Sequence, residues 1–335
     1  MLRSTRLFSR SRNLSEKVYA ITCPGQGIIK SGLLAPFSQY RCHFDDILQS
    51  TDEALKENFS KHLFNEDEEF AKQWLSRTSN AQPAILITTY ILHTILKKEF
   101  NVDLMRNPNV KYVMGHSLGE YTALCLSDAI DLETSVKLVR RRGTLMEDLI
   151  KEKPNPYEMM AVLFKPSSFS QLLKLLAEEN ILANINSYQQ LVISGHRSKL
   201  VEVVERINSL EKKKIILKTV KLPVTIPFHS DVLGEIEPEL MEFAPKSNKP
   251  LFKPIISNLT GEPVYDSSSA FTNTILANSR PVQWVASMEK CISTDITNFI
   301  NVGPGTVLQD INSKFKVQNN SMDSLKSMEE ISKLI

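Results

Sequence analysis

A short apolar run at residues 111–114 leads directly into the turn sequence Gly115-His116-Ser117-Leu118-Gly119, and residues 120–127 after it have a helical pattern. Glycines on both sides of a serine permit a sharp backbone turn, because they carry no side chain that could collide with neighbouring backbone. A strand that passes through a tight turn into a helix is typical of α/β proteins. The apolar content of 42% in 335 residues is enough for a large domain and a smaller one. The sequence therefore predicts an α/β fold.

A second pattern fills residues 157–222. Its segments are strand-like 159–164, helical 168–179, two short strands within 181–194, helical 199–210 and strand-like 215–222. This βαββαβ order is the ferredoxin-like order. The flanking residues, 16–156 and 223–335, together fit one hydrolase-like α/β domain with a parallel sheet core. We therefore expect 157–222 to be a ferredoxin-like small domain inserted into the large one.

Residues 1–15 differ from the rest of the chain in charge. They hold four arginines among serines and leucines, and no acidic residue. Such amphipathic, acid-poor segments are typical of mitochondrial transit peptides, so this segment predicts import into the mitochondrial matrix, with a disordered tail as the alternative. When these four charges are subtracted, the formal charge of +2 becomes −2, which gives no reason to expect a nucleic-acid partner. The longest apolar run, residues 84–96, is too short to span a membrane.

Ser117, at the centre of the glycine turn, is a candidate nucleophile. The turn would lift its hydroxyl out at the start of a helix, where the Leu118 N–H and the helix dipole favour a developing negative charge. A serine hydroxyl is a weak nucleophile at neutral pH and needs a base within hydrogen-bond reach, for which histidine is the usual choice. Among six histidines, His229 lies on the stiff, proline-bounded segment 222–230. The residues alone leave a structural histidine open as the alternative.

A series of further short motifs accompanies the serine turn. They are Pro24-Gly25-Gln26-Gly27, Gln82-Pro83-Ala84, Arg142-Gly143 with Met146, Pro227-Phe228-His229-Ser230, Pro281-Val282-Gln283-Trp284 and Gly303-Pro304-Gly305. Each is weak alone, but in this order and spacing they resemble the malonyl-CoA:acyl-carrier-protein transacylases of dissociated fatty acid synthesis along nearly the whole chain after the leader. With its transit-like leader, the chain is similar to the mitochondrial, fungal-type member of that family.

The resemblance implies a hydrolase-like α/β domain carrying a ferredoxin-like insert, in agreement with the segmentation. It implies that His229 takes the proton of Ser117 and later protonates the departing thiolate of coenzyme A. It also implies an oxyanion hole near Gln26 and Leu118. The residues that fall where the family lines its acyl pocket are Gln82, Met146 and Asn186.

The resemblance assigns the substrate's carboxylate to Arg142. Malonyl differs from acetyl by this terminal carboxylate, and a guanidinium offers the planar fork that binds a carboxylate in a bidentate manner. Arg142 lies 25 residues beyond Ser117, as in the family. Without the resemblance, the triplet Arg140, Arg141 and Arg142 would be interpreted as a solvated basic face. Arg140 and Arg141 remain candidates for surface contacts with the acidic carrier protein or the phosphates of coenzyme A.

The chain departs from the family at one position. The family commonly has a glutamine a few residues before the Pro-Val-Gln-Trp segment, and the backbone carbonyl of that glutamine orients the catalytic histidine. Counting back from Pro281 places Ala277 there. Because a backbone carbonyl survives replacement of the side chain, we expect His229 still to be oriented, with no acidic third member of a triad.

The activity implied is transfer of malonyl from malonyl-CoA to the phosphopantetheine thiol of acyl carrier protein, through a malonyl-serine intermediate. Such a ping-pong cycle needs no metal or bound cofactor, and we expect a monomer. Three alternatives stay open: an acyltransferase of the same fold with another acyl preference, a serine hydrolase or thioesterase, and a carrier-protein docking subunit without catalysis.

Overall fold

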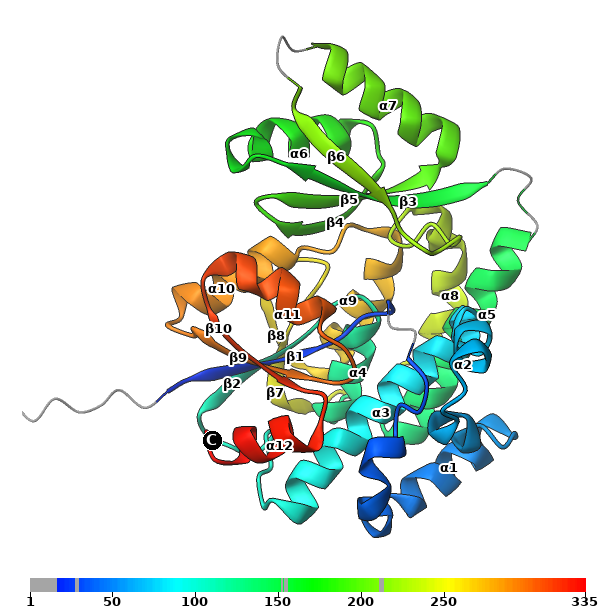
Figure 1. Cartoon of the computed structure of the whole chain (residues 1–335), viewed down its shortest axis with the longest axis vertical. Helices are drawn as coiled ribbons and strands as arrows, with labels where there is room; N and C mark the ends of the chain where they lie inside the picture. The colour runs from blue at the N-terminus through cyan, green and yellow to red at the C-terminus, as the bar shows by residue number, and fades with distance from the viewer. Residues whose placement is uncertain (1–16, 28–29, 152, 154–155, 211–213) are drawn as a thin grey trace, which may run out of the picture.

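The computed structural model describes residues 17–27, 30–151, 153, 156–210 and 214–335, which fold around two sheets (Figure 1). The predicted leader, residues 1–15, lies outside the described residues. Of the helices in the described ranges, none is both long and apolar enough to span a membrane.

The larger sheet has six strands in the order β10-β9-β1-β2-β7-β8. Their bounds are β1 Tyr19–Cys23, β2 Val110–Gly115, β7 Pro250–Ile256, β8 Pro263–Asp266, β9 Asn298–Val302 and β10 Gln318–Met322. All pairs are parallel except β7 with β8. The central strand β1 is buried along its whole length, as expected for a parallel strand covered on both faces. The parallel sheet core that the sequence predicts is confirmed, with one antiparallel edge strand added.

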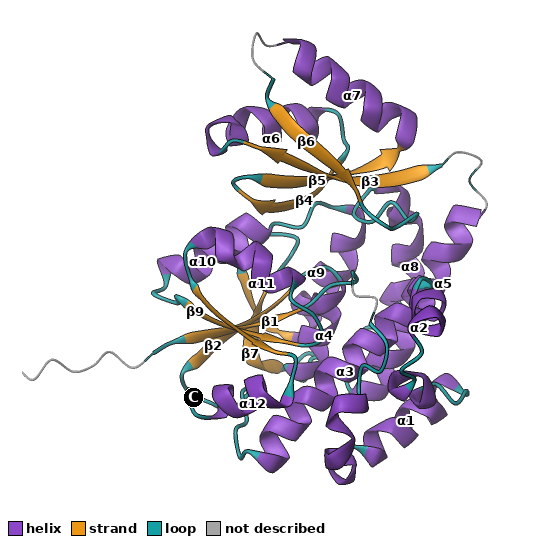
Figure 2. Cartoon of the chain, in the orientation of Figure 1, coloured by secondary structure: helices purple, strands orange, loops and turns teal. Residues whose placement is uncertain are grey.

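Helices cover both faces of this sheet (Figure 2). The helices described for the large domain are α1 Asp45–Leu55, α2 Glu68–Leu75, α3 Thr78–Glu99, α4 Leu118–Leu126, α5 Leu132–Lys151, α8 Glu237–Met241, α9 Ser267–Leu276, α10 Trp284–Ser293, α11 Val307–Asn312 and α12 Leu325–Ser332. Short 3-10 segments are η1 Ala35–His43, η2 Ser60–Phe64, η4 Asp231–Ile236, η5 Ala277–Ser279 and η6 Ser313–Phe315. The helix after β2 is buried in all nine residues, because α3, α5 and α9 pack around it.

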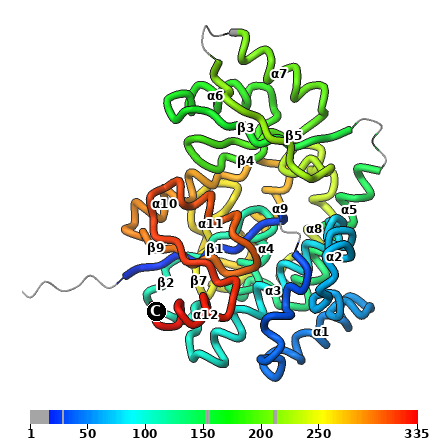
Figure 3. The backbone as a smooth tube through the Cα atoms, viewed as in Figure 1, coloured from blue at the N-terminus to red at the C-terminus, as the bar shows by residue number. Residues whose placement is uncertain are grey.

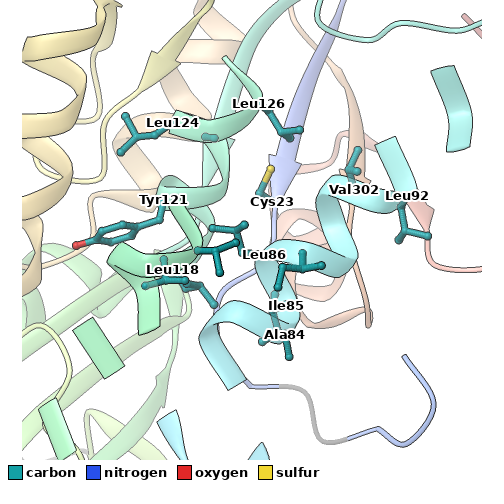
Figure 4. Packing of buried hydrophobic residues seen from close by; sticks show 14 of the residues in the cluster. Cys23, Ala84, Ile85, Leu86, Leu92, Leu118, Tyr121, Leu124, Leu126 and Val302 are labelled. Atoms are coloured by element: carbon teal, nitrogen blue, oxygen red, sulfur yellow. The ribbon is translucent and has the colours of Figure 1, made fainter. Parts of the chain in front are cut away.

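Apolar side chains fix α4 against its neighbours (Figure 4). Leu118, Tyr121 and Leu124 of α4 belong to the same buried cluster as Cys23 of β1 and Ile85 of α3. Full burial of such a side chain contributes about 1.5–3 kcal/mol each. The start of α4 is therefore a rigid support for the residue that precedes it, Ser117.

The helix α3 corrects one prediction from the sequence. Proline usually breaks a helix, so the sequence predicts a helix that begins after Pro83, but α3 begins at Thr78 and continues through this residue. A proline inside a helix removes the hydrogen bond to the carbonyl four residues earlier. Here that carbonyl belongs to Ser79, and it accepts a hydrogen bond from Arg140 at 2.9 Å instead. Arg140 of α5 thus binds the carbonyl that Pro83 leaves without a donor inside the helix.

The smaller sheet is built by one continuous stretch of chain, which leaves the large domain after α5 and returns to it before α8 (Figure 3). Its elements are β3 Tyr157–Phe164, η3 Pro166–Ser168, α6 Phe169–Glu178, β4 Leu182–Ser187, β5 Gln190–His196, α7 Arg197–Leu210 and β6 Ile216–Lys221. The antiparallel strand order β4-β5-β3-β6 is that of a ferredoxin-like fold. The fold class is therefore confirmed, while the domain boundaries at 156/157 and 222/223 stay a prediction.

The small sheet is joined to the large domain through its edge strand β4. The Ile185 N–H donates to the Val282 carbonyl, and the Val282 N–H donates to the Ala183 carbonyl, both at 2.9 Å. The helices α6 and α7 lie on the side of the small sheet that faces away from the large domain (Figure 2). The opposite face of the small sheet is thereby left to form a wall of the space between the two domains.

Candidate active site

A cleft of about 640 Å³ lies between the two sheets. Its lining includes the loop 24–27 after β1, the elbow residues 116–118, residues of β3, β4 and β5, and the segment that carries His229. The strands β1 and β2 are parallel neighbours, so their carboxyl ends meet at one edge of the sheet. Crevices outside the carboxyl ends of parallel strands are the usual ligand sites of open α/β sheets.

Ser117 lies on a sharp turn between β2 and α4. Its φ of 54° and ψ of −110° are unusual for a residue with a side chain. The two flanking glycines make the turn possible by close approach. A Cβ at Gly115 would lie 1.9 Å from the carbonyl carbon of Gly119, and a Cβ at Gly119 would lie 2.1 Å from the Cys23 carbonyl oxygen. The spacing of the elbow motif therefore reflects direct backbone contact.

His229 is placed to act on Ser117. Its Nε2 lies 2.7 Å from the Ser117 Oγ. Its Nδ1 lies 2.9 Å from the Ala277 carbonyl and 3.2 Å from the Arg280 carbonyl. Because a carbonyl can only accept, Nδ1 carries the proton and the lone pair of Nε2 is free to accept from the serine hydroxyl. The expected orienting role of the Ala277 carbonyl is confirmed in geometry, and the Arg280 carbonyl is an addition.

The environment keeps the imidazole of His229 neutral. Burial is the main cause that lowers the pKa of His229 to about 3, and the positive potentials of Arg142 and His116 act in the same direction. The hydrogen bond to the Ala277 carbonyl favours the charged form and opposes this shift. At neutral pH, His229 is therefore available as a base.

Arg142 is a buried cation at the same cleft. Only 2% of its surface is exposed, and its Nε donates to the Asn278 Oδ1 at 2.8 Å. Its guanidinium carbon lies 4.8 Å from the centre of the Tyr121 ring, in cation–π contact. The Tyr121 hydroxyl in turn accepts from Asn278 Nδ2 at 2.8 Å. In the part of the chain that the structure describes, no carboxylate lies within ion-pair distance of Arg142.

An unpaired buried guanidinium is costly, and it indicates the kind of ligand the cleft takes. Burial lowers the pKa of Arg142, but a guanidinium keeps its proton in proteins. A buried charge without a partner is strongly unfavourable, whereas an anion that enters the cleft would supply one. The cleft thus combines a serine and its base with a binding point for an anionic group.

The family follows from comparison with known proteins. An acyl transferase domain model matches residues 22–330. A malonyl CoA-acyl carrier protein transacylase of Staphylococcus aureus is 30% identical over 317 residues, which cover 93% of this chain and 96% of that protein. The chain belongs to the malonyl-CoA:acyl-carrier-protein transacylase family.

Solved structures of this transacylase family have the same fold. The enzyme from Helicobacter pylori superimposes with a TM-score of 0.80 at 27% identity and covers 95% of this chain and 98% of its own. The enzyme from Clostridium perfringens gives a TM-score of 0.78 at 28% identity, with 95% and 97% covered. The arrangement of a mostly parallel large sheet and an antiparallel small one is therefore shared with the transacylases.

The positions implied for the transacylase oxyanion hole lie beside Ser117. Gln26 and Leu118 both line the cleft. Leu118 is the first residue of α4, so its backbone N–H has no acceptor inside the helix and can face an anion at the positive end of the helix dipole. The side-chain nitrogen of Gln26 donates to the Thr78 Oγ1 at 3.2 Å, which ties the first loop to the start of α3.

Of the three residues implied for the acyl pocket, the structure brings only Asn186 to the cleft. Asn186 accepts a hydrogen bond at 2.9 Å from the Nε2 of His116, so the small sheet is linked to the elbow beside the nucleophile. Gln82 and Met146 are fully buried and do not line the cleft. The Gln82 Nε2 lies 3.8 Å from the Met146 sulfur, because the two helices that carry them, α3 and α5, pack closely.

Arg140 and Arg141 prove to be engaged within the protein. Besides the Ser79 carbonyl, Arg140 donates to the Asn80 Oδ1 at 2.6 Å and forms an ion pair with Glu57. Arg141 forms an ion pair with Glu239. The side chain of Arg140 is 21% exposed and that of Arg141 42%, so contacts of either residue with the carrier protein or coenzyme A stay a prediction.

Sequence reasoning missed the residues that hold Arg142. Asn278 and Tyr121 are 157 residues apart, and nothing in their local sequence distinguishes them from other polar or aromatic positions. The only available signal was the position of Asn278 directly after Ala277, in the segment that precedes the Pro-Val-Gln-Trp motif.

Proposed function

We propose that the protein transfers malonyl from malonyl-CoA to the phosphopantetheine thiol of acyl carrier protein by a ping-pong mechanism. Its family membership supports this activity, and one observation specifies the acyl group. Arg142 is a buried cation without a carboxylate partner among the described residues, and it lines the same cleft as Ser117 and His229. A malonyl group presents a thioester and a carboxylate on one short chain, so it can engage both ends of this site.

In the first half-reaction, the Ser117 hydroxyl passes its proton to the Nε2 of His229 as the oxygen attacks the thioester carbonyl. The backbone N–H groups near Leu118 and Gln26 hold the resulting oxyanion. When the tetrahedral intermediate collapses, the carbon–sulfur bond breaks. The thiolate of coenzyme A then takes the proton from His229, and malonyl remains on Ser117 as an ester.

The second half-reaction runs the same steps in reverse with another thiol. The phosphopantetheine thiol gives its proton to His229, and its sulfur attacks the malonyl ester. The bond to Ser117 breaks, and the serine oxygen takes the proton back from His229. In each step the imidazolium that forms transiently is stabilised at Nδ1 by the carbonyls of Ala277 and Arg280.

Intact-protein mass spectrometry tests this proposal directly. The protein is exposed briefly to malonyl-CoA or acetyl-CoA, and holo acyl carrier protein is then added. We expect a malonyl adduct that Ser117→Ala abolishes and that carrier protein discharges to form malonyl carrier protein. Release of coenzyme A without an acylated carrier protein would favour a hydrolase. Equal adducts from both acyl-CoA substrates would contradict the malonyl preference.

We further propose that the protein acts in the mitochondrial matrix, supplying fatty acid synthesis there. The support is the arginine-rich, acid-free composition of residues 1–15. A fluorescent protein fused behind residues 1–30 tests it by microscopy and protease protection, with the four arginines replaced by glutamine as the matched control. Diffuse fluorescence from the unchanged fusion would contradict this location.

We also propose that the protein acts as a monomer, because Ser117, His229 and Arg142 reach one cleft within a single chain. Light scattering during size-exclusion chromatography tests this. A dimer that dissociates on dilution with loss of activity would contradict it.

A further inference from the structure

The backbone of Ser117 is held in a conformation that its own sequence does not favour. Its φ of 54° lies in the left-handed region, where a residue with a Cβ is strained. Strain of this kind persists only where the surrounding structure determines the conformation. The glycines at 115 and 119 remove steric obstacles, and the Gly119 N–H donates to the His116 carbonyl at 3.0 Å, but neither glycine bonds the N–H of Ser117 itself.

Asn258 binds the Ser117 peptide directly, from the carboxyl end of the neighbouring strand β7. It follows β7, and only 1% of its surface is exposed. Its Oδ1 accepts the backbone N–H of Ser117 at 2.8 Å, and its Nδ2 donates to the backbone carbonyl of Gly115. One side-chain amide therefore bonds the elbow on both sides of the strained peptide.

The backbone of Asn258 is itself fixed to α4. Its N–H donates to the Oε1 of Glu120 at 3.1 Å, and Glu120 also bonds the side chains of Ser257 and Thr274. Burial raises the pKa of Glu120 to about 8, so this carboxyl is largely protonated at neutral pH and adds little charge near the nucleophile. Asn258 thus bonds the end of β2, the nucleophile Ser117 and the helix α4.

The bond to Asn258 has a consequence for the oxyanion. Because the Ser117 N–H is already used, it is not free to bind a developing negative charge, and the neighbouring N–H of Leu118 has to do so. The orientation of the Ser117 peptide therefore sets both the direction of its hydroxyl and the direction of the next N–H.

We propose that Asn258 is a positioning residue, which holds the strained peptide of Ser117 so that the hydroxyl meets His229 and the Leu118 N–H meets the oxyanion. This inference rests on the proposed acyl transfer only through the identity of the nucleophile. It predicts an effect on the reaction rate, rather than on substrate affinity, when the side chain is changed.

The test uses two variants and a matched control. Asn258→Ala removes both side-chain bonds, whereas Asn258→Asp keeps an acceptor for the Ser117 N–H and loses the donor to Gly115. The control is Asn80→Ala, since Asn80 is also buried and bonded through its side chain, to Trp74 and Arg140, without contacting the elbow. For each variant the melting temperature, the kcat and KM of malonyl transfer, and the rate of Ser117 labelling by a fluorophosphonate are measured.

We expect Asn258→Ala to lower kcat and the labelling rate about 100-fold, with KM within about twofold, because a misplaced nucleophile loses rate without losing binding. Asn258→Asp should lose about tenfold, which represents partial rescue. Asn80→Ala should keep kcat and the labelling rate within about threefold of wild type, even if its melting temperature falls as much as that of Asn258→Ala.

The proposal is wrong if folded Asn258→Ala keeps kcat and labelling within threefold, or if its loss appears in KM alone. Should Asn258→Ala fail to fold, wild-type rates in Asn258→Asp would overturn the proposal in the same way. Labelling needs no acyl-CoA, so a protein that labels normally but transfers no malonyl would contradict the proposed function and leave Asn258 to be judged by the probe.

Discussion

Two basic groups that line the cleft, His229 and Arg142, are buried to nearly the same degree, and burial has different results for them. His229 can release its proton, so burial lowers its pKa to about 3 and the imidazole becomes an acceptor for Ser117. Arg142 cannot release its proton, so it stays a cation and keeps part of the cost of desolvation until an anion arrives. Burial therefore makes His229 a base and Arg142 a binding point for an anion.

The surroundings of the two groups match these outcomes. Two backbone carbonyls hold the Nδ1 of His229, and they persist whatever side chains the segment carries. Arg142 is held by neutral side chains, Asn278 and Tyr121, which orient the guanidinium without neutralising it. Ser117 and His229 are thus fully hydrogen-bonded in the free protein, whereas Arg142 gains an anionic partner only when the substrate binds.

Removal of the base should have the largest effect. We expect His229→Ala to lower the rate of malonyl-enzyme formation by about 1,000-fold or more, because the serine loses its proton acceptor while binding through Arg142 is retained. Rapid-quench mass spectrometry of the adduct measures this rate. A loss of less than tenfold would mean that another group deprotonates Ser117.

Removal of the cation should lower malonyl transfer by about 100-fold, since a buried charge-assisted pair is worth about 2–5 kcal/mol. We expect Arg142→Met to show this loss in kcat/KM for malonyl-CoA, with little loss for acetyl-CoA. The matched control is Arg41→Met, since Arg41 is exposed, paired with Asp45 and not among the residues that line the cleft. Parallel losses for both acyl groups would contradict the carboxylate-binding role.

The melting temperature of Arg142→Met tests whether the Arg142 guanidinium is unpaired in the free protein. Without ligand, Arg142→Met should melt no lower than wild type, because the change removes an unpaired buried charge and leaves an apolar chain of similar size. Free malonate should raise the melting temperature of wild type and not that of the variant. A large fall in the unliganded melting temperature would show that Arg142 is already compensated within the protein.

The dependence of stability on pH tests the neutral state of His229. Its pKa is lowered on folding, from the ordinary value of 6.5 to about 3, so its contribution to stability is complete above 6.5 and is lost as pH falls towards 3. We expect the loss to reach about 2 kcal/mol at pH 5. Denaturant unfolding between pH 8 and pH 5 measures it, and His229→Gln should show a shallower decline. If the free energy of unfolding depended on pH in the same way in both proteins, the lowered pKa of His229 would be contradicted.

Loss of the support for Arg142 should have the smallest effect. Tyr121→Phe removes the hydroxyl that Asn278 binds but keeps the aromatic face beneath the guanidinium. We expect KM for malonyl-CoA to rise about threefold with kcat nearly unchanged, as for a single neutral hydrogen bond. Steady-state kinetics measure both constants, and a fall in kcat alone would indicate an effect on Ser117 instead.

Much of this protein could be predicted from local sequence. The glycine spacing around Ser117 predicted the elbow, and the alternation of segments in 157–222 predicted the ferredoxin-like order. His229 was favoured by its proline-bounded segment, although only the family resemblance decided between it and a structural histidine. These features are recoverable because turn residues and the period of apolar residues act over a few positions.

The tertiary structure decided which groups have partners. It continued α3 through Pro83 by giving the Ser79 carbonyl to Arg140, and it kept Gln82 and Met146 out of the cleft. It also set the protonation of His229. The relevant contacts join residues far apart in the chain, such as Ser117 with His229 at a separation of 112 and Arg142 with Asn278 at 136. Burial and pairing depend on such contacts between distant residues. The sequence therefore determined which reactive side chains the protein has, and the tertiary structure determined where they lie and whether they are charged.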